Sequence, residues 1–193
     1  MQSPFPIIIY GAGGHGRVIA ETLELLNQKN IVFWDKNFAS TSSDYPVFSP
    51  FSTNQGAVIL GIGNLQLRKE ILEDMGVEIP FISSFLAHPT AFVSPTATIN
   101  RGTWVGPLAI VHSQAQIGEH CIINSGSIVD HDARLGNNVH LAPGAVLCGQ
   151  VSIGDHTFIG ANAVIPPGIS IGNRVFIKAG SVVKENVADG GVV

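Results

Sequence analysis

The chain has 193 residues, of which 12% are charged and 45% are hydrophobic, and its formal net charge is −4. This length fits one domain or two small ones, and the aliphatic content together with 22 glycines argues against a disordered chain. No basic cluster and no apolar stretch of membrane-spanning length is present, which argues against nucleic acid or a membrane as a partner, so we expect a cytoplasmic protein.

The first segment with a clear pattern is a strand, a glycine turn and a helix. Ile7–Tyr10 is a short apolar run that predicts a buried strand, and residues 17–28 have helical spacing. Between them, Gly11, Gly13 and Gly16 match G-x-G-x-x-G in the structural order that this pattern requires. Because the first N–H groups of a helix are unpaired and carry positive partial charge, the arrangement favours a bound phosphate. The alternative is that the glycines only let the strand and the helix pack closely.

Further strands extend this unit. Residues 31–34 predict a second strand, which ends at Asp35, roughly 20 residues past the turn, where a ribose-binding carboxylate belongs. Ala57–Leu60 predicts a third strand, followed by a second glycine turn at residues 61–64 and a helix, and residues 81–83 predict a fourth strand. A dinucleotide fold needs two such halves. We therefore expect a half-domain that binds one nucleotide, and not a dehydrogenase.

A six-residue repeat from Val93 to Ala188 organises the rest of the chain. Its aliphatic positions are Val93, Ile99, Val105, Val111, Ile117, Ile123, Val129, Leu135, Leu141, Leu147, Ile153, Ile159, Ile165, Ile171, Ile177 and Val183. A period of six fits neither a free-standing helix nor an alternating strand, but it fits a β-solenoid in which each block makes one short strand and one corner. A β-sandwich of short strands is the alternative, although its strands and loops would vary in length.

Two other positions of the repeat favour the solenoid. Four residues after each aliphatic comes a small or β-branched residue, such as Ala109, Ala115 or Cys121, which we expect to let the corner close. The residue after the aliphatic is often glycine, and we expect these glycines to take backbone angles that other residues resist. They are Gly106, Gly118, Gly136, Gly154, Gly160 and Gly172.

The six-residue run closely resembles the hexapeptide-repeat acyltransferases. That family folds as a left-handed parallel β-helix with three blocks per triangular coil. The resemblance implies this fold for residues 87–193, as an acetyltransferase domain that follows a Rossmann-like nucleotide-sugar-binding domain at residues 1–86. The short segment at residues 84–92 connects the two.

Taken whole, the chain resembles a narrower group, the nucleotide-sugar N-acetyltransferases of bacterial glycan synthesis. This group includes the enzymes that acetylate UDP-4-amino-4,6-dideoxy sugars on the way to bacillosamine, and perosamine N-acetyltransferases and sialic acid O-acetyltransferases share its layout. The motifs that carry the resemblance are residues 9–16, 33–35, 61–64, 88–91, 124–132 and 140–145. They imply acetyl transfer from acetyl-CoA to the 4-amino group of a nucleotide-linked sugar, with UDP as the expected nucleotide. They also imply a homotrimer with acetyl-CoA between neighbouring chains, and no metal.

His131 is the candidate catalytic base. Asp130 and Asp132 flank it, and a carboxylate near an imidazole raises the basicity of the ring and fixes its tautomer. Gly149 lies one coil further along, so it leaves room beside His131 and offers a backbone N–H to a developing oxyanion. In the family the histidine of this motif is the base and the acid after it assists, which carries over to His131 and Asp132. The alternative is a surface histidine in an acidic corner.

The resemblance also implies which residues bind the two substrates. For acetyl-CoA they are His140, Gly149, Ala161 and Ala179. For the nucleotide sugar, the glycine turns and the resemblance together give Gly11, Gly13, Gly14, His15, Gly16, Asp35, Gly63, Asn64 and Asn124.

Three other functions are compatible with parts of the sequence. A sugar O-acetyltransferase would have the same site and a different acceptor, and the sequence does not separate the two. A β-helix carbonic anhydrase would bind zinc with three histidines across a trimer interface, but that family lacks a nucleotide domain, and no pair of histidines here has its short spacing. A scaffold that binds nucleotide sugars without catalysis is the third.

Overall fold

The computed structural model describes residues 6–36, 45–48, 56–74 and 80–193, and the chain divides into two compact units, residues 1–83 and 84–193. The division falls slightly before the expected boundary, because Ser84 and Leu86 already bond to the second unit. The Ser84 carbonyl accepts from Gly102 N–H at 3.1 Å, and Leu86 N–H donates to the Thr103 carbonyl at 2.8 Å. In the described residues no helix is long and apolar enough to cross a membrane.

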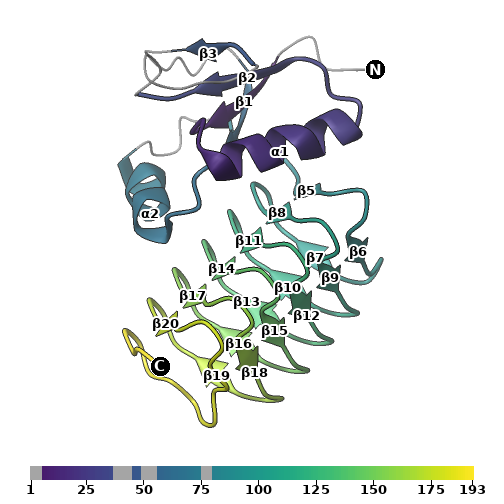
Figure 1. Ribbon diagram of the computed structural model, residues 1–193. Coiled ribbons are helices and arrows are strands. Elements are labelled where there is room, and N and C mark those ends of the chain that lie inside the picture. The colour runs from purple at the N-terminus through teal and green to yellow at the C-terminus, as the bar shows by residue number, and fades with distance from the viewer. Residues whose placement is uncertain (1–5, 37–44, 49–55, 75–79) are drawn as a thin grey trace. The chain divides into compact units, whose positions relative to one another are not determined.

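In its described residues the first unit contains a parallel sheet and two helices (Figure 1). Its elements are β1 (Ile7–Tyr10), α1 (Gly14–Leu25), β2 (Ile31–Trp34), β3 (Val47–Phe48), β4 (Ala57–Leu60) and α2 (Leu65–Asp74), and the described strands lie in the order β3-β2-β1-β4. The strands predicted from apolar runs at β1, β2 and β4 are confirmed. The short strand β3 does not lie in a longer run of apolar residues, and it was not predicted from the sequence.

Two predicted boundaries in this unit were wrong. The helix expected at residues 17–28 begins at Gly14 and ends at Leu25, because Asn27 takes a left-handed φ of 62° that a helix cannot continue. The fourth strand expected at residues 81–83 is reduced to one bridge between Phe81 and Val58.

The second unit is a parallel β-solenoid whose two-residue strands lie in three sheets (Figure 1). Each sheet is named by the kind of outward side chain that most of its strands carry. The polar face holds β7 (Thr98–Ile99), β10 (Gln116–Ile117), β13 (Arg134–Leu135), β16 (Ser152–Ile153) and β19 (Ser170–Ile171). The aliphatic face holds β6 (Phe92–Val93), β9 (Ile110–Val111), β12 (Ile128–Val129), β15 (Val146–Leu147) and β18 (Val164–Ile165). The aromatic face holds β5 (Leu86–Ala87), β8 (Trp104–Val105), β11 (Ile122–Ile123), β14 (His140–Leu141), β17 (Phe158–Ile159) and β20 (Phe176–Ile177).

The pairing register confirms the solenoid. Ile117 lies opposite Ile99 on one side and Leu135 on the other, so each strand pairs with strands one full coil of three blocks away. The same offset holds in the other two sheets, where Ile123 lies opposite Leu141 and Val129 opposite Leu147. A β-sandwich is therefore excluded for this unit.

The interior of the solenoid is built from the two apolar positions of the repeat. All the aliphatic positions from Val105 to Val183 are buried, and the small residues of the repeat, such as Ala109 and Ala133, fill the same core. Since side chains alternate across a strand, the residue before each aliphatic faces outward. The three faces thus differ only in these outward residues.

The reason given for the repeated glycines was wrong. The glycines that follow the aliphatics do not have a left-handed backbone, which is found instead at the second corner residue of successive blocks, for example Asp132 with a φ of 59° and Gly144 with a φ of 70°. Gly154 is required because a Cβ there would lie 2.6 Å from the backbone nitrogen of Asn173 in the next coil. These glycines therefore let adjacent coils approach closely.

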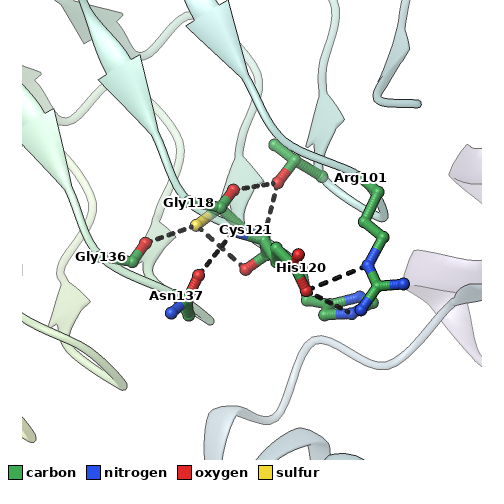
Figure 2. Close-up of polar contacts among 8 residues, drawn as sticks. Arg101, Gly118, His120, Cys121, Gly136 and Asn137 are labelled. Carbon is green, nitrogen blue, oxygen red and sulfur yellow. Dashed lines mark hydrogen bonds and ion pairs between the residues drawn. The ribbon is translucent and has the colours of Figure 1, made fainter. Parts of the chain in front are cut away.

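Polar side chains inside the solenoid satisfy the backbone of neighbouring blocks, as Figure 2 shows around Cys121. Thr103 Oγ1 accepts from Cys121 N–H at 2.9 Å and donates to the Gly118 carbonyl at 2.8 Å. Cys121 has the same role in the next coil, where its Sγ donates to the Gly136 carbonyl at 3.2 Å and accepts from Val139 N–H at 3.4 Å. The buried thiol is therefore a structural group.

One corner of the solenoid carries a ladder of carbonyl and carboxylate oxygens that bond to the coil before. The four accepting residues are Asn137, Asp155, Asn173 and Asp189, each through its Oδ1 atom. Asn137 accepts from Glu119 N–H at 2.8 Å, and Asp155 accepts from Asn137 N–H at 2.6 Å. Asn173 accepts from Asp155 N–H and Asp189 accepts from Asn173 N–H, both at 2.8 Å. We call these four residues the corner ladder. At its end the hydrogen bonds from Asn173 lower the pKa of Asp189.

Candidate active site and nucleotide pocket

His131 and Asp132 form the corner that follows β12. The Nδ1 atom of His131 lies 2.8 Å from Oδ2 of Asp132, and both side chains are about half exposed. The hydrogen bond to Asp132, reinforced by the charge of Asp130, raises the pKa of His131. Because the carboxylate accepts the Nδ1 proton, the neutral ring carries its lone pair on Nε2. This is the tautomer that a general base needs.

Gly149 lies directly against the imidazole of His131. A Cβ at Gly149 would lie 2.6 Å from Nε2 and 2.7 Å from Cε1, so only glycine leaves the ring in this position. The neighbouring amides are engaged, since Cys148 N–H donates to the Ile165 carbonyl and Gln150 N–H to the His131 carbonyl. Within the described residues the Gly149 N–H makes no hydrogen bond. A basic nitrogen and an available amide donor thus share this corner.

Asn124 and His140 meet on the aromatic face. The Nδ2 of Asn124 lies 3.4 Å from Nε2 of His140, while Oδ1 of Asn124 accepts from Ser125 N–H at 2.8 Å. Since the amide oxygen is engaged in this way, Nδ2 is the donor and Nε2 of His140 is the acceptor. His140 is buried and lies edge-on to Phe158, with ring centroids 5.1 Å apart.

Three of the four residues predicted for acetyl-CoA occupy two different corners of the solenoid, and the fourth, His140, lies in β14. Gly149 shares the corner of His131 and Asp132. Ala161 and Ala179 lie in the corner that follows Asn124, one and two coils beyond Pro143, where Gly180 N–H bonds to the Ala161 carbonyl at 2.8 Å. In the coil that contains His131, strand β12 separates the two corners. A single chain therefore does not bring His131 together with Asn124 and His140.

The first unit holds a pocket of about 540 Å³ at the carboxyl ends of β1, β2 and β4. Its lining includes the predicted residues Gly11, Gly13, Gly14, His15, Asp35, Gly63 and Asn64. The two glycine turns thus face one cavity, as expected from their places after parallel strands. Helix α1 has no acidic residue in its first turn, so its N-terminal N–H groups can receive a phosphate.

Three predicted pocket residues have structural contacts of their own. Gly16 does not line the pocket. A Cβ there would strike the Gly11 carbonyl, so the role of Gly16 is close packing of α1 against the turn. Asp35 accepts from Ala12 N–H at 3.0 Å through Oδ2, which ties the end of β2 to the first turn. Asn64 caps α2, since its Oδ1 accepts from Leu67 N–H at 2.9 Å.

The pocket also contains residues that the sequence did not single out. Tyr10 and Trp34 end neighbouring strands, and their rings lie 4.1 Å apart between centroids. Burial, with smaller contributions from Asp35 and Asp74, raises the pKa of Tyr10, so its hydroxyl stays protonated. Glu70 lies one helical turn before Asp74 on the pocket side of α2, a spacing that could have been read from the sequence once α2 was placed beside the sheet.

Metal-binding groups are absent from the portion of the chain that the structure describes: no three His, Cys, Asp or Glu side chains gather there in a way that could hold an ion.

Family models match both units. Residues 6–75 match the PglD N-terminal domain, and residues 96–131, 115–149 and 132–167 match the bacterial transferase hexapeptide of six repeats. Residues 150–185 match the hexapeptide repeat of succinyl-transferase.

Solved structures match nearly the whole chain. The acetyltransferase domain of PglB from Neisseria gonorrhoeae, in complex with acetyl coenzyme A, is 33% identical with a TM-score of 0.89, over 97% of this chain and 95% of that one. PerB from Caulobacter crescentus, in complex with CoA and GDP-perosamine, is 30% identical with a TM-score of 0.88, over 100% of this chain and 95% of that one. WeeI from Acinetobacter baumannii is 26% identical with a TM-score of 0.85, over 97% and 95%.

Proposed function

The chain belongs to the hexapeptide-repeat acetyltransferases of the nucleotide-sugar group, and from this premise we propose that it transfers the acetyl group of acetyl-CoA to the 4-amino group of a UDP-linked amino-dideoxy sugar. It is an acetyl-CoA-dependent sugar N-acetyltransferase, in keeping with the similar PglB domain that binds acetyl-CoA and the similar GDP-perosamine N-acetyltransferase. The proposal for this chain's own chemistry depends on one observation, the contact of His131 with Asp132 on one side and Gly149 on the other.

His131 acts as the general base in the proposed reaction. Its Nε2 takes a proton from the 4-amino nitrogen as that nitrogen attacks the carbonyl carbon of acetyl-CoA. Asp132 holds the Nδ1 proton and stabilises the imidazolium that forms. General-base assistance of this kind contributes about 10²–10⁴-fold to the rate.

Gly149 is proposed to bind the oxyanion. The tetrahedral intermediate carries a negative oxygen, and the Gly149 N–H is an amide donor in the same corner as Nε2. When the intermediate collapses, the C–S bond breaks, CoA leaves as the thiolate, and the N-acetylated sugar remains. No covalent acyl-enzyme is formed.

The complete site is proposed to need two chains of a homotrimer. His131 and Gly149 lie at one corner, whereas Asn124, His140, Ala161 and Ala179 lie at or beside another. A neighbouring chain whose second corner faces the first would bring the two groups together, with acetyl-CoA between them. The aliphatic face supports such a contact, because Ile110, Ile128 and Val146 point outward there, where the polar face has Gln116, Arg134 and Ser152.

The nucleotide is proposed to bind the pocket of the first unit. Its phosphates would lie at the N-terminus of α1 beside Gly13 and Gly14, and its ribose near Asp35. Tyr10 and Trp34 offer an aromatic surface to the base.

The test is release of CoA thiol from acetyl-CoA with three acceptors: a UDP-4-amino sugar, a GDP-4-amino sugar and free sialic acid. We expect turnover with the UDP-4-amino sugar, a loss of about 10²–10⁴-fold in kcat for His131→Ala, and little change in KM. His156→Gln is the matched control, since His156 is also a corner histidine and its Nδ1 lies 3.1 Å from Nδ2 of Asn138 in the coil before.

Other outcomes would redirect the proposal. Turnover with the GDP-linked sugar alone would replace UDP by GDP, and turnover with sialic acid alone would replace the amine by a hydroxyl acceptor. Full activity of His131→Ala would remove the proposed base. Nucleotide binding without any turnover would favour a binding scaffold.

A further inference from the structure

We infer that Arg68 is a positioning residue of the nucleotide pocket, which holds the second glycine turn in place and supplies a buried positive charge behind it. This inference rests on the proposed nucleotide site in the first unit. Arg68 belongs to the first turn of α2 and is only 1% exposed, although arginine is seldom fully buried.

The guanidinium of Arg68 donates to two backbone carbonyls at the point where β4 leads into the second glycine turn. Its Nη1 donates to the Ile62 carbonyl at 3.1 Å and to the Leu60 carbonyl at 3.3 Å. Ile62 lines the pocket, so one of these bonds is made to the pocket wall itself. A single side chain thus bridges the last residue of β4 and the loop that leaves it.

The second glycine turn packs against the first glycine turn and fixes its position. Gly61 N–H donates to the Tyr10 carbonyl at 2.9 Å, and a Cβ at Gly61 would lie 2.7 Å from the Gly11 carbonyl oxygen and 2.8 Å from the Gly16 Cα. A Cβ at Gly11 would likewise lie 2.7 Å from the Ile62 side chain. Because the two turns are in contact without spare room, a shift of Ile62 would displace the glycine turn proposed to hold the phosphates.

The charge of Arg68 matters as well as its hydrogen bonds. Among the described residues that line the pocket, Asp35, Glu70 and Asp74 carry carboxylates and Lys36 carries the positive charge. A diphosphate is negative and would be repelled by this lining. A guanidinium stays protonated when buried, and its field is screened less than that of an exposed lysine. Arg68 therefore offsets the carboxylates where a negative ligand is proposed to bind.

A purely structural role for Arg68 makes a different prediction. If it served only to stabilise α2, its loss would lower the affinity for every ligand of the pocket in proportion to unfolding. If it also positions and charges the phosphate side, its loss will weaken a nucleoside diphosphate more than the corresponding nucleoside. Kinetically, KM for the nucleotide sugar should rise while kcat and KM for acetyl-CoA stay near wild type.

The experiment compares Arg68→Met, Arg68→Lys and the control Lys69→Met in the full chain. Lys69→Met removes the same charge from the next residue of α2, where Lys69 pairs with Glu73 on the surface. Binding of UDP, GDP, uridine and guanosine is measured by calorimetry or competition, with thermal unfolding recorded for each variant. We expect Arg68→Met to weaken the preferred diphosphate about tenfold or more, and its nucleoside much less. Arg68→Lys should retain some of the affinity, and Lys69→Met should retain it all.

Three results would overturn the inference. One is equal weakening of diphosphate and nucleoside, and another is unchanged diphosphate affinity in Arg68→Met. The third is an equal effect of Lys69→Met, which would mean that net charge alone is responsible. If Arg68→Met does not fold, Arg68→Lys tests the positioning role, because it keeps the charge and changes the hydrogen bonds to the Leu60 and Ile62 carbonyls: equal affinities of this variant and wild type for the diphosphate would overturn that role. Failure of the wild-type chain to bind either diphosphate would instead overturn the proposed nucleotide site, and this inference with it.

Discussion

The pair His131 and Asp132 shows how two adjacent residues can set the chemistry of a surface corner. Asp132 has a left-handed backbone, with a φ of 59°, and its carboxylate lies 2.8 Å from the imidazole of the preceding residue. Adjacent side chains in an extended strand point to opposite faces and would not meet. The corner conformation, imposed by the solenoid, is thus what allows neighbours in sequence to form a base and its orienting acid.

This contact predicts the pH dependence of the reaction. A raised pKa means that His131 becomes neutral, and therefore active as a base, only at higher pH, so kcat/KM should rise through this pKa and level off above it. Asp132→Asn removes the main cause of the raised pKa. In this variant we expect the acidic limb of the pH profile of kcat/KM to shift to lower pH. We also expect the plateau value of kcat/KM to fall, because the imidazole becomes a weaker base.

The measurement is the pH profile of kcat/KM for wild type and Asp132→Asn with the same sugar, so that the titration of the substrate amine cancels in the comparison. Asp155→Asn, at another corner, is the control and should leave the limb in place. If the acidic limb of the pH profile is unchanged in Asp132→Asn, the group that titrates in that limb is not His131.

At the scale of elements, the strands of the solenoid are too short to be stable alone, and its coils are held by repeated contacts between neighbours. The corner ladder is one such contact, in which a side-chain oxygen of each coil accepts from a backbone N–H of the coil before. The oxygen, not the charge, is common to all four residues, since two are Asn and two are Asp.

This pattern predicts that Asp155→Ala destabilises the solenoid and Asp155→Asn does not. The alanine leaves the Asn137 N–H, now bonded at 2.6 Å, without its acceptor, which should cost about 1 kcal/mol of unfolding free energy. The asparagine keeps an oxygen in the same place. Urea unfolding checks both variants, and equal loss in the two would show that the carboxylate charge, not the acceptor, holds the corner.

For the whole molecule, the two groups of site residues on separate corners lead to a prediction about assembly. If each site uses His131 of one chain and His140 of its neighbour, His131→Ala and His140→Ala chains should each be impaired alone but active when mixed. Random mixing in equal amounts leaves roughly a quarter of the sites with both histidines, because each heterologous interface draws one residue from each side.

The test is to unfold or dissociate the two variants together, reassemble them and measure CoA release against each variant alone. Mixing His131→Ala with Asp132→Asn is the control, because both changes affect the same corner and no mixed site is complete. Activity that never exceeds the sum of the separate variants would show that one chain holds the full site, or that the chains do not assemble as proposed.

The sequence alone determined much of this protein. The unbroken period of six predicted a solenoid, since a repeat that places one aliphatic in each block can bury it only inside a coil. Strand, glycine turn and helix in that order predicted the first unit, and the acidic flanks of His131 marked the candidate base. Each of these signals is local, so it can be read without knowing what lies across the fold.

Only the tertiary structure decided what each residue touches across the coils. It showed that Gly154 makes room for Asn173 of the next coil, and that His131 lies at a corner whereas His140 lies in β14 on the aromatic face. It also placed Glu70 in the wall of the pocket and Arg68 behind it. These facts depend on how strands pair and how helices lie beside a sheet, which brings together residues far apart in the chain and therefore leaves no pattern in any short stretch of it.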